Sequence, residues 1–365
     1  MVLPNMQESL NITTTQIGFV GTANFIGYII GILFTNFLYN KYSTHNLITT
    51  TISLQAFSMF IMTFFSDYLL ISFFYTISGF FSAVANISVM SYMANVIPKE
   101  IRGKVLGIVV GANGFAIVLV GQIVPIIEST ITQMPWKISW SIFALMLLSI
   151  AFFSRPGIRK HASHKVAETK IKAYKYLKTF SFWKISFIYM LFGISYSVYV
   201  TYFVSAVIDK YQVSTSLSGD FWAVLGFCSI FSGFLFGTIA DKVGPFKSLI
   251  FAYMLQMIAH FILVIDINSS VIWFSAIAFG FSVWSIPSLV TLLISMHFDV
   301  NRTAQVLSLV TLLFALCQAL GPVSAGYIFD ITNDFSSVFM LTSILTLIAV
   351  VLSFIFSKQE IKQIH

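Results

Sequence analysis

The sequence predicts an all-α protein that crosses a membrane many times. Its 365 residues are 58% hydrophobic and only 9% charged, and the mean hydropathy is +0.90. A charged side chain costs about 2.5 to 3.5 kcal/mol at the centre of a spanning helix, and the charges here fall between long apolar runs. A run of roughly 20 apolar residues crosses the hydrocarbon core as a helix. The runs are too long for barrel strands, the other structure that can span a bilayer.

Eleven such runs divide into a first group of five and a second group of six. The first five cover about 17–39, 47–65, 68–96, 104–127 and 137–154, and the last six cover about 181–209, 216–240, 247–266, 270–296, 304–328 and 336–356. We therefore expect an N-terminal bundle over 1–154, a basic linker over 155–180, a C-terminal bundle over 181–357 and a tail over 358–365.

The distribution of Lys and Arg predicts the orientation. With the linker in the cytoplasm, all of the 20 Lys and Arg residues fall on the inner side except Lys137 and Lys210. Cytoplasmic loops carry an excess of these residues. We expect a multi-pass protein of the cell inner (plasma) membrane with a cytoplasmic C-terminus, so membrane topology explains the net charge of +7 and no nucleic-acid partner is expected.

An internal repeat predicts two related bundles. The pattern from Gly31 to Ile48 returns 202 residues later, and the pattern from Arg102 to Gly121 returns 200 residues later. Both matched loops are cytoplasmic, which indicates a parallel duplication of six helices. The first bundle has five, so we expect eleven of twelve helices, with residues 1–6 as the end of an absent first helix. A natural eleven-span protein is the alternative.

The sequence lacks the motifs of several functional classes. Cys228 and Cys317 lie within spans and suggest neither a disulfide nor a metal site. The chain has no G-x-x-x-x-G-K-[ST] loop for a nucleotide, no nucleophile motif and no paired metal-ligand histidines. We expect neither an enzyme nor a cofactor or metal.

Two motifs resemble the major facilitator superfamily (MFS). Gly237, Asp241, Lys242, Gly244 and Lys247 match its G-x-x-x-D-R/K-x-G-R/K loop, whereas the first-half counterpart over 35–45 has lost this pattern. The segment 321–327, which begins Gly-Pro, is similar to the element that bends a gate helix in that superfamily. The segments 16–28, 192–196 and 201–202 are similar to its uncharacterised YbfB/YjiJ-type bacterial branch.

This resemblance implies that helices one, four, seven and ten line a central cavity. The substrate-contact candidates are the polar and aromatic residues Asn24, Tyr28, Asn86, Tyr92, Asn113, Tyr189, Tyr196, Tyr199, Tyr202, Trp284, Ser285 and Gln318. Interhelical hydrogen bonding and packing explain each of them equally well. The centres of spans four, seven and ten carry no ionisable residue, and His260 in span nine is interpreted as a packed core histidine.

The resemblance further implies a secondary active transporter that moves a small organic molecule by alternating access, with two bundles rocking about a cavity. Proton coupling and facilitated diffusion are both open, and the protein is expected to be a monomer. Aromatic and amide side chains, with no buried Lys or Arg expected, favour a neutral or amphipathic solute. The rival hypothesis is an inactive or sensor-type MFS-like membrane protein.

Gating candidates follow from the same motifs. Asp241 is expected to form a cytoplasmic latch with the helix start near Arg102, and Arg302 marks the symmetric position, where Tyr39 supplies no carboxylate. Gly321 and Pro322 are candidate hinges.

The latch predicts that Asp241→Asn shifts the balance between inward-open and outward-open states and slows transport, because a neutral amide loses the charge-assisted bond. Transport assays with site-specific accessibility labelling measure both effects. Unchanged transport and an unchanged balance would contradict the latch.

Overall fold

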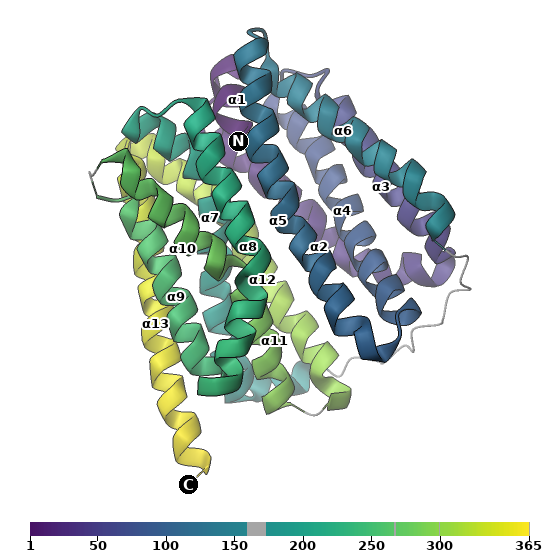
Figure 1. Ribbon diagram of the computed structural model, residues 1–365, viewed down its shortest axis with the longest axis vertical. Coiled ribbons are helices and arrows are strands. Elements are labelled where there is room, and N and C mark those ends of the chain that lie inside the picture. Colours follow the sequence, from purple (N-terminus) through teal and green to yellow (C-terminus); the bar gives the residue numbers. More distant parts are fainter. Residues whose placement is uncertain (159–172, 266–267, 299, 365) are drawn as a thin grey trace. The chain divides into compact units, whose positions relative to one another are not determined.

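The computed structural model describes residues 1–158, 173–265, 268–298 and 300–364. Within these ranges, the side chains of residues 94, 95, 99–107, 110, 173–175, 300–302, 304 and 359–364 are not described. The described chain is helical throughout (Figure 1), as the apolar runs predict. It divides into two compact units, and each is considered by itself.

The N-unit comprises residues 2–110 and 126–170. Its helices are α1 (Leu3–Leu10), α2 (Thr14–Lys41), α3 (Thr44–Met62), α4 (Tyr68–Val96), both ends of α5 (Lys99–Thr130), and α6 (Pro135–Ser154), which continues into the short 3₁₀ helix η1 (Arg155–Gly157). In this unit α4 packs between α2 and α3, and α6 packs on the other side of α3 (Figure 1).

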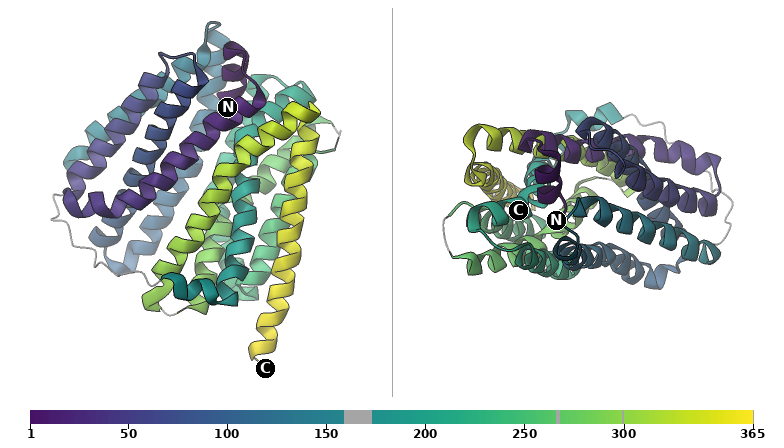
Figure 2. Two further views of the ribbon diagram at one scale, coloured as in Figure 1. Left: turned by 180° about the vertical axis from the view of Figure 1, so that it is seen from behind. Right: turned by 90° about the horizontal axis from the view of Figure 1, so that it is seen from above.

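The C-unit comprises residues 171–365, Met1 and the middle of α5, residues 111–125. Its helices are η2 (Ala173–Lys178), α7 (Phe180–Tyr211), α8 (Thr215–Val243), α9 (Pro245–Ile262), η3 (Ser269–Val271), α10 (Ile272–Val283), α11 (Ser285–His297), α12 (Val300–Thr332) and α13 (Phe335–Ile364). The long helix α13, yellow in Figure 2, packs against α9 and α7. The predicted boundaries at 154 and 181 stay a prediction. The middle of α5, residues 111–125, joins the C-unit because Gly114 and Gly121 lie against the backbone of α8.

Ten helical segments of the described residues are long and apolar enough to cross a membrane. They correspond to all the expected runs except 47–65. That run forms α3, whose many Thr and Ser residues, with Asn46 and Gln55, make it less hydrophobic. The interrupted run 270–296 forms two helices, α10 and α11, in place of one.

Glycines bring α2 and α4 into backbone contact inside the N-unit. A Cβ atom added to Gly27 would overlap the carbonyl oxygen of Thr76, and one added to Gly79 would overlap the carbonyl oxygen of Asn24. Small residues at helix interfaces allow this close approach in membranes, where packing rather than the hydrophobic effect drives association. The Asn24 amide then donates to the carbonyl oxygen of Tyr75 at 3.1 Å.

We predict that Gly27→Ala destabilises the protein by about 1 to 3 kcal/mol, because the methyl group forces the two backbones apart. Thermal unfolding in detergent measures the effect. Gly237→Ala is the matched control, since a Cβ atom there meets no atom within 4 Å. Equal melting temperatures for the two variants would contradict this account of the α2–α4 contact.

Candidate substrate-binding site

The span Ser269–His297 is interrupted at Trp284, between α10 and α11. Pro287 explains the interruption. A proline lacks the N–H that would bond the carbonyl four residues earlier, here that of Val283, and its ring clashes with that carbonyl. Helix α10 ends at Val283.

Neighbouring serines satisfy the backbone groups at this break. The backbone N–H of Trp284 donates to the hydroxyl oxygen of Ser232 on α8 at 3.2 Å. The hydroxyl of Ser285 donates to the carbonyl oxygen of Ser282 at 2.6 Å. Non-helical backbone at membrane depth is tolerated where protein groups satisfy it, and discontinuous helices mark the binding sites of many transporters.

Five rings of α7, α10 and the break form an aromatic ladder: Phe203, Tyr199, Phe279, Tyr196 and Trp284. Successive ring centroids lie 4.9, 3.7, 6.4 and 6.2 Å apart. The first three rings are fully buried, whereas Tyr196 and Trp284 are only half-buried. The ladder therefore has a core end and an accessible end, and the accessible end lies at the helix break.

The accessible end carries neutral hydrogen-bonding groups. The indole Nε1 of Trp284 makes no hydrogen bond among the described residues, although this atom is shielded from solvent. Tyr196 supplies a phenol beside it. Phe192 flanks Tyr196, with a centroid separation of 5.4 Å. An aromatic wall with an indole donor and a phenol suits an uncharged organic group.

The other candidate tyrosines of α7 are buried in the C-unit core. The Tyr199 hydroxyl lies 2.8 Å from that of Ser275, which donates to the carbonyl oxygen of Ala259. Tyr202 donates to the carbonyl oxygen of Pro322 at 2.8 Å. Tyr189 stacks on Phe314 with centroids 4.3 Å apart. These contacts favour packing for all three tyrosines, and their contact with substrate stays a prediction.

The candidate hinge residues of α12 contact α7. A Cβ atom added to Gly321 would overlap the hydroxyl of Ser197, and Pro322 accepts the bond from Tyr202. Gln318 is half-buried one turn earlier, and its backbone nitrogen would lie 3.1 Å from a Cβ atom added to Gly193. The α7–α12 contact thus packs the Gly-Pro segment closely against α7, and both a bend and hinge motion there stay predictions.

The N-unit has its own polar pair on α2 and α4. The Asn86 amide donates to the phenol oxygen of Tyr28 at 3.1 Å, and Asn86 is exposed while Tyr28 is half-buried. A polar pair facing lipid would be costly, so such residues generally face a bundle interior or a water-filled cavity. Asn24 serves the α2–α4 contact described above, Tyr92 is buried near the end of α4, and Asn113 is exposed on α5.

The expectation that no Lys or Arg is buried is wrong. Lys184 near the start of α7 is only 8% exposed, and its Nζ lies 4.5 Å from the ring centroid of Phe246 and 5.0 Å from that of Phe356. Aromatic rings attract a buried ammonium group in this geometry, which is why a lysine at the end of a span can be buried. Tyr196 is twelve residues further along α7, or about 18 Å at 1.5 Å per residue.

His260 and the latch residues complete the candidate list. His260 is fully buried, and its Nδ1 lies 2.9 Å from the hydroxyl of Thr342, consistent with a packed core histidine. Asp241 is exposed near the end of α8 and makes no ion pair among the described residues. The side chains of Arg102 and Arg302 lie outside the described residues.

Sequence reasoning named Trp284 and Ser285 but missed Pro287 and Ser232. Pro287 carried a usable signal, since a proline within a helical pattern breaks or kinks it. Ser232 carried none, because its role depends on the packing of α8 against α10. The pair formed by the Gln122 amide and the Asp220 carboxylate, 3.1 Å apart, was also missed.

Solved membrane transporters share this fold. A bacterial homolog of the human lysosomal transporter Spinster, in an inward-facing and unoccupied conformation, has a TM-score of 0.80 at 12% identity over 99% of this chain and 92% of its own. Nucleoside transporter NupG has a TM-score of 0.76 at 12% identity, and a D-xylose-proton symporter 0.74 at 17%, each over 96% of this chain and 92% of its own. The protein is an all-α, multi-pass membrane protein with the MFS fold.

A family model identifies the protein more closely. The model described as "Uncharacterised MFS-type transporter YbfB" matches residues 1–354, and the chain belongs to that family. No curated protein matches the chain in sequence. The protein is an MFS-type membrane transporter and not an enzyme.

We predict that Ser232→Ala lowers the free energy of unfolding by about 1 to 3 kcal/mol, because the Trp284 N–H loses its acceptor in a buried setting. Thermal unfolding with a native-state hydrogen-exchange measurement at Trp284 reports it. Ser295→Ala, which removes an exposed hydroxyl bonded to the carbonyl oxygen of Leu292 within α11, is the control. Rapid hydrogen exchange of the Trp284 N–H in the wild-type protein would show that its bond to Ser232 is not formed.

Proposed function

We propose that this protein is a secondary active transporter that carries a small, uncharged organic molecule by alternating access. We further propose that the molecule contacts Tyr196 and Trp284 in the C-unit. Substrate contact at Tyr28 and Asn86 in the N-unit stays a prediction. Membership of the transporter family supports the first part. The accessible end of the aromatic ladder, placed at a proline-broken helix, supports the second.

The observation that carries the proposal is the shielded Nε1 of Trp284 without a hydrogen-bond partner among the described residues. Leaving a buried donor unsatisfied costs about 1 to 3 kcal/mol. A solute with a hydroxyl or carbonyl oxygen would remove this cost on binding. Such a gain would be specific, because an analogue without the oxygen would leave the donor unpaired.

The chemistry of this surface favours an uncharged solute. The two residues named for it supply a phenol and an indole, and the buried cation Lys184 lies about 18 Å along α7 from Tyr196 by helix geometry. Nucleosides and pentoses are suitable first test solutes, since structural neighbours are titled as a nucleoside transporter and a D-xylose-proton symporter.

The membrane placement follows the charge distribution of the sequence. We propose the inner (plasma) membrane, a cytoplasmic C-terminus and a monomer. We also propose that α3 crosses the membrane with the ten more apolar segments, which makes eleven spans. The direction of transport, import or export, is open, and so is the choice between proton coupling and facilitated diffusion. Transport assays with and without a pH gradient distinguish these alternatives.

We predict that Tyr196→Phe and Trp284→Phe each raise the half-saturation concentration for transport by about 2- to 12-fold, which corresponds to one lost neutral hydrogen bond of about 0.5 to 1.5 kcal/mol. Uptake and efflux of nucleosides and pentoses in proteoliposomes measure it.

Tyr199→Phe is the matched control, because it removes a hydroxyl from the same ladder at its buried end. We expect a lower melting temperature and an unchanged half-saturation concentration. A transport defect in Tyr199→Phe, with none in Tyr196→Phe or Trp284→Phe, would contradict the proposed site.

A further inference from the structure

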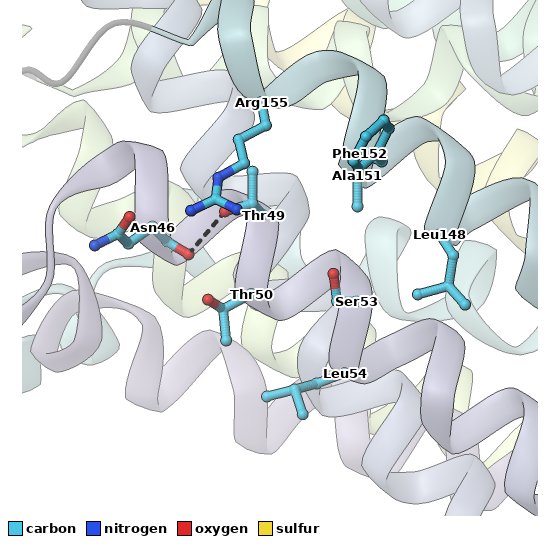
Figure 3. Close-up of a pocket in the computed structure, with 9 residues that line it drawn as sticks. All are labelled: Asn46, Thr49, Thr50, Ser53, Leu54, Leu148, Ala151, Phe152 and Arg155. Carbon is cyan, nitrogen blue, oxygen red and sulfur yellow. Dashed lines mark hydrogen bonds between the residues drawn. The ribbon is translucent and has the colours of Figure 1, made fainter.

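A pocket of about 530 Å³ lies between α3 and α6 in the N-unit, and it includes none of the candidate substrate-contact residues (Figure 3). Its volume falls within the usual range for ligand pockets of roughly 300 to 1,000 Å³. The lining residues are Asn46, Thr49, Thr50, Ser53, Leu54, Leu148, Ala151, Phe152 and Arg155. Arg155 is the charged member of this set, and none of the nine is acidic.

The two walls of the pocket come from regular helical stripes. On α3 the polar residues Asn46, Thr49, Thr50 and Ser53 follow the i, i+3, i+4, i+7 spacing of one helix face. On α6 the same spacing runs through 148, 151, 152 and 155, which are apolar up to the arginine. A polar face on α3 thus meets an apolar face on α6, over seven residues or about 10 Å of helix.

The pocket also changes character along its length. The guanidinium group of Arg155 extends from the end of α6 toward Asn46 and Thr49, whereas Leu148 and Leu54 lie at the other end (Figure 3). Asn46 is the third residue of α3, and Arg155 follows the last residue of α6. With α3 and α6 spanning the bilayer as proposed above, both residues would lie at the membrane–water interface, and the two leucines would lie about two turns deeper in the hydrocarbon.

The position of Arg155 is held by a contact across the same two helices. His45 Nδ1 lies 2.8 Å from the carbonyl oxygen of Ile158, just after η1. This contact ties the chain after α6 to the start of α3. The hydroxyls of Thr50 and Ser53 make no hydrogen bond among the described residues, so both are available to a ligand.

Exposed apolar side chains flank the pocket. Phe152 on its rim is 73% exposed and the adjacent Phe153 is 77% exposed. Large apolar side chains exposed on a spanning helix contact acyl chains. These apolar side chains disfavour entry of a free ion or a soluble metabolite.

We propose that this pocket binds one anionic phospholipid of the cytoplasmic leaflet. The phosphate would be bound by the Arg155 guanidinium, which presents a fork of donors suited to phosphate oxygens, together with Asn46, Thr50 and Ser53. The first part of an acyl chain would lie against Leu54, Leu148 and Phe152. Basic pockets between spanning helices on the cytoplasmic side bind such head groups, and the leaflet rests on the orientation proposed above.

Native mass spectrometry of the detergent-solubilised full chain, titrated with phosphatidylglycerol or phosphatidylcholine of equal chain length, tests the proposal. We expect the wild-type protein to retain one phosphatidylglycerol with about tenfold higher affinity than phosphatidylcholine. Arg155→Gln should remove this preference, because the loss of one charge-assisted contact of about 1.4 kcal/mol corresponds to a factor of ten. Equal affinities for the two lipids in the wild-type protein, or an unchanged preference in Arg155→Gln, would overturn it.

Lys41→Gln is the matched control, since Lys41 is an exposed cation in the last turn of α2 at the same end of the N-unit and lines no part of the pocket. We expect it to keep the preference; loss of the preference there would show a non-specific charge effect. Thr50→Trp fills the pocket from an exposed position without changing its charge, and it should abolish retention while the melting temperature stays unchanged. Undiminished retention in this variant would overturn the proposal even if Arg155→Gln failed to fold. Displacement of the lipid by inorganic phosphate would instead show a site for a free anion.

Discussion

The hydrocarbon environment requires that each backbone N–H and C=O find a protein partner, and the interrupted helix at Trp284 shows how the chain meets this requirement. Pro287 removes a helical bond, and Ser232 and Ser285 provide partners for groups near the gap. The Ser285 bond is local, whereas Ser232 comes from α8, so the Trp284 N–H has its partner only where α8 packs against the break. The position of the Trp284 ring, and with it the accessible end of the aromatic ladder, depends on this local solution.

The same requirement separates packing residues from candidate contact residues. The hydroxyls of Tyr199, Tyr202 and Tyr253 each meet a partner within 2.8 Å, and all three rings are buried. Their hydroxyl groups form hydrogen bonds that join α7 to neighbouring helices. The indole nitrogen of Trp284 has no such partner among the described residues. The indole nitrogens of Trp136 and Trp140 share this property, so it is the place of Trp284 at the helix break and at the half-buried end of the ladder that distinguishes it.

Hydropathy alone predicted the helices well, because a run of about twenty apolar residues is typical of a helix that spans a membrane. Ten of the eleven expected runs correspond to strongly apolar helical segments. The less apolar α3 shows the limit of this measure, since its polar stripe lines a pocket against α6. Composition could not predict that Lys184 is buried, because its stabilising rings come from α9 and α13, far away in the sequence.

The candidate site was harder to predict, and Tyr196 and Tyr199 show why. They are three residues apart on one helix, both are aromatic, and nothing in the sequence distinguishes them. Only the packing of α10 decides that Tyr199 is enclosed between Phe203 and Phe279 while Tyr196 lies beside Trp284. The family resemblance could be predicted from one loop motif and one helix motif, because each is a short run of residues that can be read directly from the sequence.

The central proposal is that a solute reaches the ladder from water at its Trp284 end, whereas the Tyr199 end faces the protein core. Thiol accessibility tests it most directly: cysteine is placed at position 284 or 199 in a chain with Cys228 and Cys317 replaced by alanine, and a small water-soluble thiol reagent is applied to the reconstituted protein. The account predicts rapid labelling in Trp284→Cys and none in Tyr199→Cys. Labelling at position 199 with none at position 284 would contradict it.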